Sequence, residues 1–493
     1  MRGEKWERSQ QRRPDPPKSC GPRRLAAGGR IARAYRTMPG VPPDPGRVPA
    51  MRPPEVPVPL IRPFRALRYR ATAAPDPSLV VSPPYDVISP EQQQALLARH
   101  PRNVVRLDLP EPERPGEADD RYRRAARTLA AWRSDGTLAK DPRPGLYVLE
   151  QTYRVPGTSE ERVQRGFFGR LRLEPLEPGS GVLPHERTLA APREDRYRLL
   201  RATGVNTSPV VALYRDAGGR AAQVLEQVAG GPPDVAVSDD DGVRSRMWIV
   251  PDDEDRSGIV ASLAAAAGAG PITIADGHHR YETALRYRDE RRMSRSCEED
   301  PPFDYLLAVL LDAGSQPLTV LPTHRLVRDL ADDGGALLAA LGGLFECQAA
   351  DRPTLEAWGT DGAGGRGRIG LWTRRGGHVM TARRDAFEPW LPPGGPAVRA
   401  LDVTLLSVAL ERLAGIDVDA VAAGDRIRYT KSVNEAMARV DGAVDGADAA
   451  FLLEPTPVRS IVEVAAQGDV MPQKSTYFYP KPLTGLVINP HEW

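Results

Sequence analysis

The sequence predicts a mixed α/β protein of two subdomains that follow a disordered tail. The chain has 493 residues, more than one ordinary hydrophobic core accommodates. Hydrophobic residues make up 41% and charged residues 27% of it, which is typical of soluble globular proteins. Short β-branched runs alternate with helix-forming segments, and glycine and alanine become frequent from about residue 329. We therefore expect a tail over 1–57, an N-terminal α/β domain over 58–328 and a C-terminal α/β subdomain over 329–493.

The expected tail has no hydrophobic periodicity. Its proline- and arginine-rich stretches, such as 12–17 and 42–45, cannot bury enough apolar surface to offset the entropy lost on ordering. We expect disorder over residues 1–57. Two alternatives stay open, namely a true start at Met38 or Met51, and a basic arm that binds nucleic acid.

Local patterns predict the elements of the N-terminal domain. Serine caps helices and proline suits the first helical turn, so a helix should start at Ser89 or Pro90. Apolar residues at helical spacing predict an amphipathic helix over about 119–135. The other expected elements are strands over 145–153, 166–173, 210–214, 247–250, 272–275 and 305–311, and helices over 192–202, 259–267 and 278–292.

The C-terminal subdomain is expected to mix both element types. Leu401 to Leu413 has a strong helical pattern, and 427–430 and 449–453 read as strands. A helix over 432–440 should be capped by Ser432.

Charge and cysteine content restrict the function classes. The chain holds 67 Lys and Arg against 65 Asp and Glu, a net charge of +2, which argues against nucleic-acid binding through a broad basic field. No apolar run reaches the length of a membrane span, and no signal-peptide core is present at the N-terminus. The three cysteines, Cys20, Cys297 and Cys347, have no metal-type spacing and suit a reducing cytoplasm. We expect a cytoplasmic protein without a membrane partner.

A candidate anion site follows the expected strand 272–275. A tight turn at Asp276 and Gly277 leads into a helix that begins with His278, His279 and Arg280. Strand, glycine turn and helix together direct backbone N–H groups and a positive helix end at an anion. Arg280 is expected to contact phosphate oxygens, a histidine to transfer a proton, and Asp276 to accept a proton or hold Mg²⁺. The alternative is a well-capped helix with surface histidines.

Further polar residues are candidates at strand ends and turns. His185 and Glu186 place an imidazole beside a carboxylate, although a metal site from this stretch alone is weakly supported and a structural loop is an equal alternative. Asp86 lies in a proline-stiffened turn, and Lys431 and Lys474 stand out because most basic residues here are arginines. Thr207, Ser208 and His324 lie at expected strand ends, where α/β proteins often bind ligands. The metal, if there is one, stays unknown.

Two common phosphate-binding motifs are absent from the sequence. No glycine-rich loop ends in Gly-Lys-Ser or Gly-Lys-Thr, and no Gly-x-Gly-x-x-Gly lies between a strand and a helix. The sequence therefore argues against a P-loop kinase and a standard dinucleotide enzyme.

These stretches together resemble an uncharacterised bacterial and archaeal family, domain of unknown function 1015. The resemblance covers roughly residues 60 to 493. The matching stretches are 83–89, 183–188, 206–210, 241–248, 274–284, 322–325, 429–431 and 471–488.

A shorter motif suggests a more distant relationship. Asp-Gly-His-His-Arg at 276–280 is similar to the signature of ParB-like and sulfiredoxin-like domains. Members of that superfamily bind nucleotides with this turn, and some phosphorylate free serine. The resemblance implies a ParB/sulfiredoxin-like mixed sheet in the N-terminal domain and a link to serine or phosphoserine.

Phosphoryl transfer on a small substrate is the function we expect, as a kinase or a phosphatase. Asp276, His278, His279, His185 and Glu186 are the expected catalytic residues. The expected binding residues are Gly277, Arg280, Asp86, Thr207, Ser208, His324, Lys431 and Lys474. A phosphorylated small molecule is the expected partner, with Mg²⁺ and a nucleotide or pyrophosphate as cofactors. The alternative is a non-enzymatic, ParB-like regulator that binds a nucleotide.

Overall fold

A computed structural model describes residues 58–112, 120–177, 179–188, 190–294, 299–330, 335–359, 367–442 and 446–492. The tail expected over 1–57, with Met38, Met51 and Cys20, lies outside these residues, as does Cys297. The described residues form a mixed α/β protein, as the sequence predicts.

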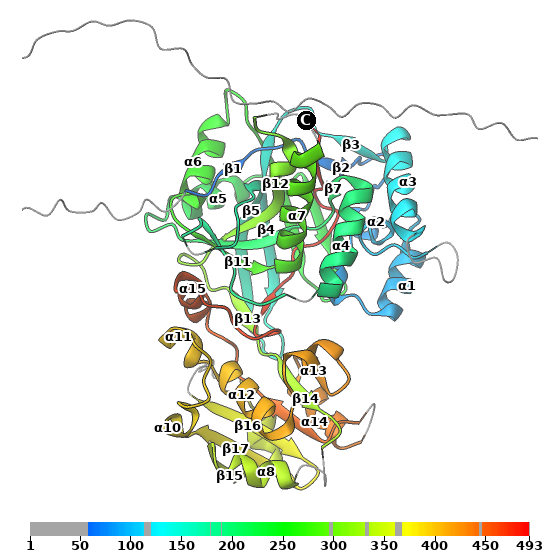
Figure 1. The fold of residues 1–493 in the computed structure, drawn as a ribbon. Coiled ribbons are helices and arrows are strands. Elements are labelled where there is room, and N and C mark those ends of the chain that lie inside the picture. Colours follow the sequence, from blue (N-terminus) through cyan, green and yellow to red (C-terminus); the bar gives the residue numbers. More distant parts are fainter. Residues whose placement is uncertain are drawn as a thin grey trace, which may run out of the picture. The chain divides into compact units, whose positions relative to one another are not determined.

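A mixed nine-stranded sheet is the largest element of the described chain (Figure 1). Its strand order is β6-β11-β8-β12-β5-β4-β10-β9, with β1 paired to β5. The pairs β6–β11 and β8–β12 are parallel, and the other pairs are antiparallel. The bounds are β1 (Ile61–Arg62), β4 (Gly145–Arg154), β5 (Glu161–Arg172), β6 (Val182–Leu183), β8 (Val210–Tyr214), β9 (Val235–Ser238), β10 (Arg244–Pro251), β11 (Ile272–Asp276) and β12 (Tyr305–Asp312).

Four helices cover one face of this sheet. They bury Leu200, Leu225, Leu263 and Tyr281 against sheet residues such as Phe167. Burial of apolar side chains at about 25 cal/mol per Å² is the main source of stability here. The helices are α4 (Ala190–Thr203), α5 (Arg220–Ala229), α6 (Ser257–Ala267) and α7 (His278–Ser294), and α4 and α7 lie side by side in front of the sheet in Figure 1.

The C-terminal part of the chain covers the opposite face. Ile461, Phe478 and Leu486 pack there against sheet residues such as Leu307. The elements of this layer are α11 (Pro396–Arg399), α15 (Val458–Ala466), and β13 (Thr319–Leu321) paired with β20 (Tyr477–Tyr479). Residues 471–488 therefore return to the N-terminal sheet and bring their polar side chains to it.

A second, six-stranded antiparallel sheet has the order β15-β17-β16-β19-β14-β18. Helices α8 and α12 pack on one face, and α9 and α14 on the other. The bounds are β14 (His324–Val327), β15 (Phe345–Ala350), β16 (Arg368–Thr373), β17 (Gly376–Ala382), β18 (Ile427–Thr430), β19 (Ala449–Leu452), α8 (Gly335–Leu341), α9 (Arg352–Glu356), α10 (Arg384–Phe387), α12 (Asp402–Ala414), α13 (Val418–Ala423) and α14 (Val433–Val440).

The remaining described elements flank the large sheet. Ser89 caps α1 with a capping box, as expected from the serine and proline at that point. The elements are η1 (Pro77–Leu79), η2 (Tyr85–Val87), α1 (Pro90–Arg99), α2 (Val105–Asp108), α3 (Asp120–Ser134), η3 (Pro302–Asp304), β2 (Leu67–Tyr69) paired with β3 (Leu138–Lys140), and β7 (Val205–Asn206) paired with β21 (Asn489–Pro490).

The expected division at residue 329 stays a prediction. The second sheet includes β14, which precedes that position, and residues 471–490 pair with segments near the large sheet. The likeness of the large sheet to ParB- or sulfiredoxin-like domains also stays a prediction. Across the described ranges, we find no helix with the length and hydropathy needed to traverse a bilayer.

Candidate active site

The turn between β11 and α7 has the backbone geometry that the sequence predicts. Gly277 has a φ of +91°, a conformation that residues with a side chain rarely adopt. A Cβ at this position would lie 2.9 Å from Nε of Arg280, so the glycine also allows the arginine to fold back over the turn. Helix α7 starts at His278, and its first backbone N–H groups have no partner within the helix.

Asp276 is a largely buried carboxylate between two cations. Its Oδ2 accepts a hydrogen bond from Nη2 of Arg280 at 2.6 Å, and its Oδ1 pairs with Nζ of Lys481. Burial by itself raises the pKa of Asp276, but the charges of Lys481 and Arg280 together outweigh burial and hold that pKa well below its ordinary value. Asp276 is therefore ionised at neutral pH, and it fixes both cations.

Arg280 is engaged with the protein itself. Besides its bond to Asp276, its Nη1 donates to the carbonyl oxygen of Pro209. The side chain is 11% exposed. Arg280 thus holds Asp276 and the turn in place, and its expected contact with phosphate stays a prediction.

A cavity of about 390 Å³ opens at this turn, within the size range of small-molecule sites. Its charged lining consists of five cationic and three carboxylate side chains, a formal excess of +2. These residues are Arg187, Arg280, Lys431, Lys474, Lys481, Asp86, Glu186 and Asp276. The lining therefore favours an anionic ligand.

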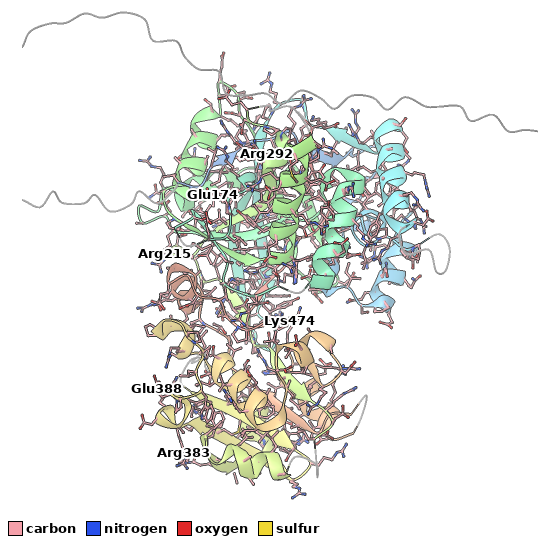
Figure 2. The ribbon with its side chains drawn as sticks, viewed as in Figure 1. Glu174, Arg215, Arg292, Arg383, Glu388 and Lys474 are labelled. Atoms are coloured by element: carbon pink, nitrogen blue, oxygen red, sulfur yellow. The ribbon has the colours of Figure 1, made fainter. Side chains whose placement is uncertain are left out.

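Lysine is rare in this chain and concentrated at this cavity. The sequence has six lysines among its 67 basic residues, and three of them line the cavity. Figure 2 shows Arg292 near the top of α7 and Lys474 below the opposite end of that helix. A lysine ammonium is a compact point charge that suits phosphate oxygens.

Two of the cavity lysines, Lys431 and Lys481, contact the ring of Tyr477. Nζ of Lys431 lies 3.8 Å and Nζ of Lys481 lies 4.6 Å from its centroid, distances typical of cation–π contacts. Burial, followed by the charges of Lys481 and Lys474, lowers the pKa of Lys431. The lysines thus repel one another, and an anionic ligand would relieve this repulsion.

Glu186 is a second carboxylate in the cavity, with a different environment. Its Oε1 accepts a hydrogen bond from the backbone N–H of Lys474 at 3.1 Å, and it forms no ion pair with a described residue. Burial raises the pKa of Glu186 to about 7, although the hydrogen bond and charge of Lys474 oppose the rise. A carboxyl group with a pKa near 7 can accept or donate a proton at physiological pH.

Lys474 adopts a backbone conformation that is costly for a residue with a side chain. Its φ is +56°, one of two such values at non-glycine positions in the described chain. Left-handed backbone at non-glycine residues costs about 1–3 kcal/mol and is found often at functional sites. This geometry presents the N–H of Lys474 to Glu186, while its side chain lines the cavity.

His185 and His278 are both buried, and His278 also lines the cavity together with His279. Nδ1 of His185 lies at hydrogen-bond distance, 2.5 Å, from the carbonyl oxygen of Ile274, and its Nε2 lies 3.0 Å from Oγ1 of Thr476. The backbone N–H of His185 donates to Nε2 of His278. Burial lowers the pKa of His185 to about 4 and that of His278 well below its ordinary value, so both rings are neutral.

His279 lines the cavity and has a lowered pKa, because of burial and then the nearby charge of Lys474. His185 does not line the cavity. It joins β6, β11 and the C-terminal segment, which makes it a positioning residue. Both histidines of the adjacent pair, His278 and His279, therefore line the cavity, and Nε2 of His278 also accepts a hydrogen bond from the backbone N–H of His185.

The other expected site residues are divided between the cavity and its surroundings. Asp86 is exposed and lines the cavity. Thr207 and Ser208 lie outside the lining, and both hydroxyls hydrogen-bond Oδ1 of Asp108, at 2.6 and 3.5 Å. His324 is fully buried in β14, where its Nδ1 accepts from the backbone N–H of Leu453.

The contacts of Thr207 reach the cavity wall indirectly. Asp108 also pairs with Arg196, whose guanidinium lies 3.9 Å from the ring centroid of Tyr85. Tyr85 lines the cavity beside Asp86. Thr207 and Ser208 thus support the wall of the cavity rather than its ligand surface.

Sequence reasoning missed Lys481 and Tyr477, which the structure places at the centre of the site. The rarity of lysine, which singled out Lys431 and Lys474, applies equally to Lys481. Its position between Pro480 and Pro482 is a further local signal, because prolines fix the backbone on both sides.

The carboxylates of the cavity allow one arrangement for Mg²⁺. No cluster of three or more metal-binding side chains occurs among the residues that the structure describes. Magnesium, however, usually takes one or two carboxylates and completes its shell with waters and substrate phosphates. Asp86 forms no ion pair with described residues and would be its ligand, whereas Asp276 is committed to Lys481 and Arg280.

Replacing Gly277 with alanine should weaken ligand binding, and should lower the unfolding free energy no more than an alanine at a control glycine does. The positive φ predicts a cost of about 1–3 kcal/mol in unfolding free energy, and the new Cβ displaces Arg280. Gly157→Ala is the matched control, because Gly157 has a φ of +80° and a Cβ there would meet no atom within 4 Å. We expect similar stability losses by urea denaturation, but weaker pyrophosphate binding by calorimetry only in Gly277→Ala. Equal binding by both variants would contradict the role given to the turn.

Comparisons with known proteins identify a family and several distant structures. A family described as a protein of unknown function (DUF1015) matches residues 61–404. No curated protein matches the chain.

Three solved structures resemble the chain at low TM-scores. A mutant free serine kinase in complex with ADP has 14% identity and a TM-score of 0.31, and the match covers 60% of this chain and 84% of that one. A conserved hypothetical protein from Pyrococcus furiosus has 13% identity, a TM-score of 0.31, and coverage of 60% and 87%. SbnI with a C-terminal truncation, from Staphylococcus aureus, has 8% identity, a TM-score of 0.30, and coverage of 62% and 82%.

Proposed function

This chain belongs to the DUF1015 family of proteins of unknown function, and we propose that it transfers a phosphoryl group to or from a small hydroxylated substrate such as serine. The observation that carries the proposal is the convergence of Lys431, Lys474 and Lys481 on a cavity that also holds Glu186. Phosphoryl transfer needs mainly charge neutralisation and positioning, and these groups can supply both.

Each group has a separate part in the proposed reaction. The three lysines and the N-terminal end of α7 hold the phosphate oxygens. Glu186 accepts the proton of the substrate hydroxyl, whose oxygen attacks the terminal phosphorus while the bond to the leaving group breaks. In the reverse or hydrolytic direction, water or the leaving group takes the place of that hydroxyl. Asp276 acts by holding Lys481 and Arg280.

A nucleotide or pyrophosphate would supply the phosphoryl group, and Mg²⁺ bound near Asp86 would neutralise part of its charge. Serine is chosen as the substrate because the Asp-Gly-His-His-Arg turn is similar to that of domains of which some phosphorylate free serine. Calorimetry with ADP, ATP and pyrophosphate, followed by assays with serine and phosphoserine, tests the proposal. Absence of binding and of turnover for all of these compounds would reject it.

A nucleotide-binding regulator is the alternative, since the same lysines would bind a nucleotide without chemistry. It predicts binding of a nucleotide by calorimetry, no phosphoserine formed or consumed, and a ligand-dependent change in affinity for a protein partner. Both proposals therefore predict nucleotide binding, but the phosphoryl-transfer proposal alone predicts that phosphoserine is formed or consumed.

The pH dependence of activity should report Glu186. Its pKa of about 7 in the folded protein means that kcat/KM rises with pH and levels off above about 7, as the base loses its proton. Glu186→Gln should lose most activity and this inflection. A profile that is flat between pH 5 and 8 in the parent protein would contradict the assignment.

Stability should show the opposite pH trend. The folded pKa of Glu186 is raised above its ordinary value of 4.5, so the folded state holds more protons between pH 4.5 and about 7. The contribution of Glu186 to unfolding free energy is therefore most favourable at the acid end of this window and is lost as pH rises through it. Glu186→Gln should flatten that slope in urea denaturation curves.

A further inference from the structure

A second cavity, of about 300 Å³, is lined in part by residues of α12 and α13. Most of its wall is apolar and includes Trp390, Val408, Ile416 and Val418. It shares Arg187 and Tyr429 with the first cavity, but none of the lysines of the first cavity line it. The second cavity thus has a different chemical character.

Arg325 is a buried cation in the wall of this second cavity. The residue is 4% exposed and forms no ion pair with any described residue. Its Nη1 and Nη2 donate to the carbonyl oxygens of Thr323 and Lys474, at 2.5 and 3.2 Å. Carbonyl groups satisfy its hydrogen bonds but carry no full charge. Burial lowers the pKa of Arg325 to about 10 and outweighs the attraction of the Glu186 carboxylate, which forms no ion pair with it.

Another polar group of the same wall has no hydrogen-bond partner among the described residues. This group is the buried Oγ1 of Thr404. Buried polar groups in native proteins nearly always have a partner, supplied by protein, water or ligand. A buried cation and a buried hydroxyl in one apolar wall therefore point to a ligand with an acceptor group.

The charges of the wall restrict the ligand further. Glu411 and Asp417 also line the cavity, so its two arginines and two carboxylates leave no formal excess of charge. A phosphate dianion would meet these carboxylates, whereas a monoanion can pair with Arg325 alone. The hydrophobic remainder suits a hydrocarbon or aromatic body.

We propose that this cavity binds a small amphipathic carboxylate, with its head group at Arg325 and Thr404 and its apolar body along α12 and α13. Tyr429 lines both cavities, and its ring centroid lies 5.7 Å from Cζ of Arg325. A ligand in one cavity can therefore affect ligand binding in the other. The proposal stands independently of phosphoryl transfer, because it uses neither the lysines nor Glu186.

Calorimetry on the full chain with octanoate and octan-1-ol as probes tests the head group. We expect octanoate to bind at least about ten-fold more tightly than the alcohol, since a charged hydrogen bond of this kind is worth that much. Arg325→Gln should remove this preference and leave binding of the alcohol unchanged. Equal affinities in the parent protein, or a preference that persists in Arg325→Gln, would overturn the proposal.

Two further variants and a control keep the test decisive if circular dichroism shows that Arg325→Gln does not fold. Thr404→Val should weaken octanoate by about three- to ten-fold without affecting the alcohol. Val418→Trp, at a residue 53% exposed, should block both probes, whereas Val163→Trp, 40% exposed and outside the cavity, should change neither. Octanoate binding that survives Val418→Trp unchanged, or no octanoate binding by the parent protein at millimolar concentration, would also overturn the proposal.

Discussion

Lys481→Met is expected to abolish most binding of phosphorylated ligands, at a cost of about 2–5 kcal/mol in binding free energy. The side chain of Lys481 is 8% exposed, lines the cavity and pairs with Asp276. Its removal takes away one of three lysine charges and also leaves Asp276 with Arg280 as its remaining cationic partner. Calorimetry with pyrophosphate and ADP would measure the loss.

Lys140→Met is the matched control for this experiment. Lys140 is the one lysine of the described chain that does not line the cavity, and its Nζ donates to the carbonyl oxygen of Glu492. Its replacement should leave the affinity within about 0.5 kcal/mol of the parent value. Equal losses from both replacements would show that overall charge, rather than the cavity, governs binding.

Asp276→Ala is expected to destabilise the folded protein by about 3–5 kcal/mol, because it leaves two buried cations without their carboxylate. The side chains of Asp276, Arg280 and Lys481 are 16%, 11% and 8% exposed, so water cannot replace the lost partner fully. Urea denaturation followed by circular dichroism would give the change in unfolding free energy.

An exposed ion pair provides the comparison. Asp240 is 78% exposed and pairs with Arg99, so Asp240→Ala should cost about 0–1 kcal/mol. A loss below about 1 kcal/mol in Asp276→Ala would contradict the account of Asp276 as the residue that holds the two cations.

Local patterns predicted the elements near the site with good accuracy. The strands over 210–214 and 427–430 match β8 and β18, and Ser432 caps α14 through a bond from the N–H of Glu435. The turn at Asp276 is also as expected. These features depend on side-chain periodicity, caps and glycine, which all act over a few residues.

Long-range pairing could not be predicted in the same way. β13 pairs with β20, about 160 residues later, and no local pattern records that pairing. The segment that contains β20 also brings Lys481 to Asp276. Neither segment alone therefore predicts this ion pair.

Residue roles were harder to predict than residue positions. The hydrogen bonds of Arg280 and His185 go to Asp276, Pro209, Ile274 and Thr476, and the expected action of both residues on a ligand stays a prediction. The residue type determines which hydrogen bonds a side chain can form. Which of them are formed within the protein depends on the fold. Glu186 lines the cavity, and its raised pKa suits acid–base chemistry, but its expected catalytic role also stays a prediction.

A ³¹P NMR assay of serine with ATP, ADP or pyrophosphate and Mg²⁺ would detect phosphoryl transfer on serine directly. We expect a phosphoserine signal in at least one mixture, or its decay when phosphoserine is supplied. Lys481→Met and Glu186→Gln should lose this turnover, while Lys140→Met should retain it. A folded parent protein that neither forms nor consumes phosphoserine in any mixture would contradict phosphoryl transfer on serine.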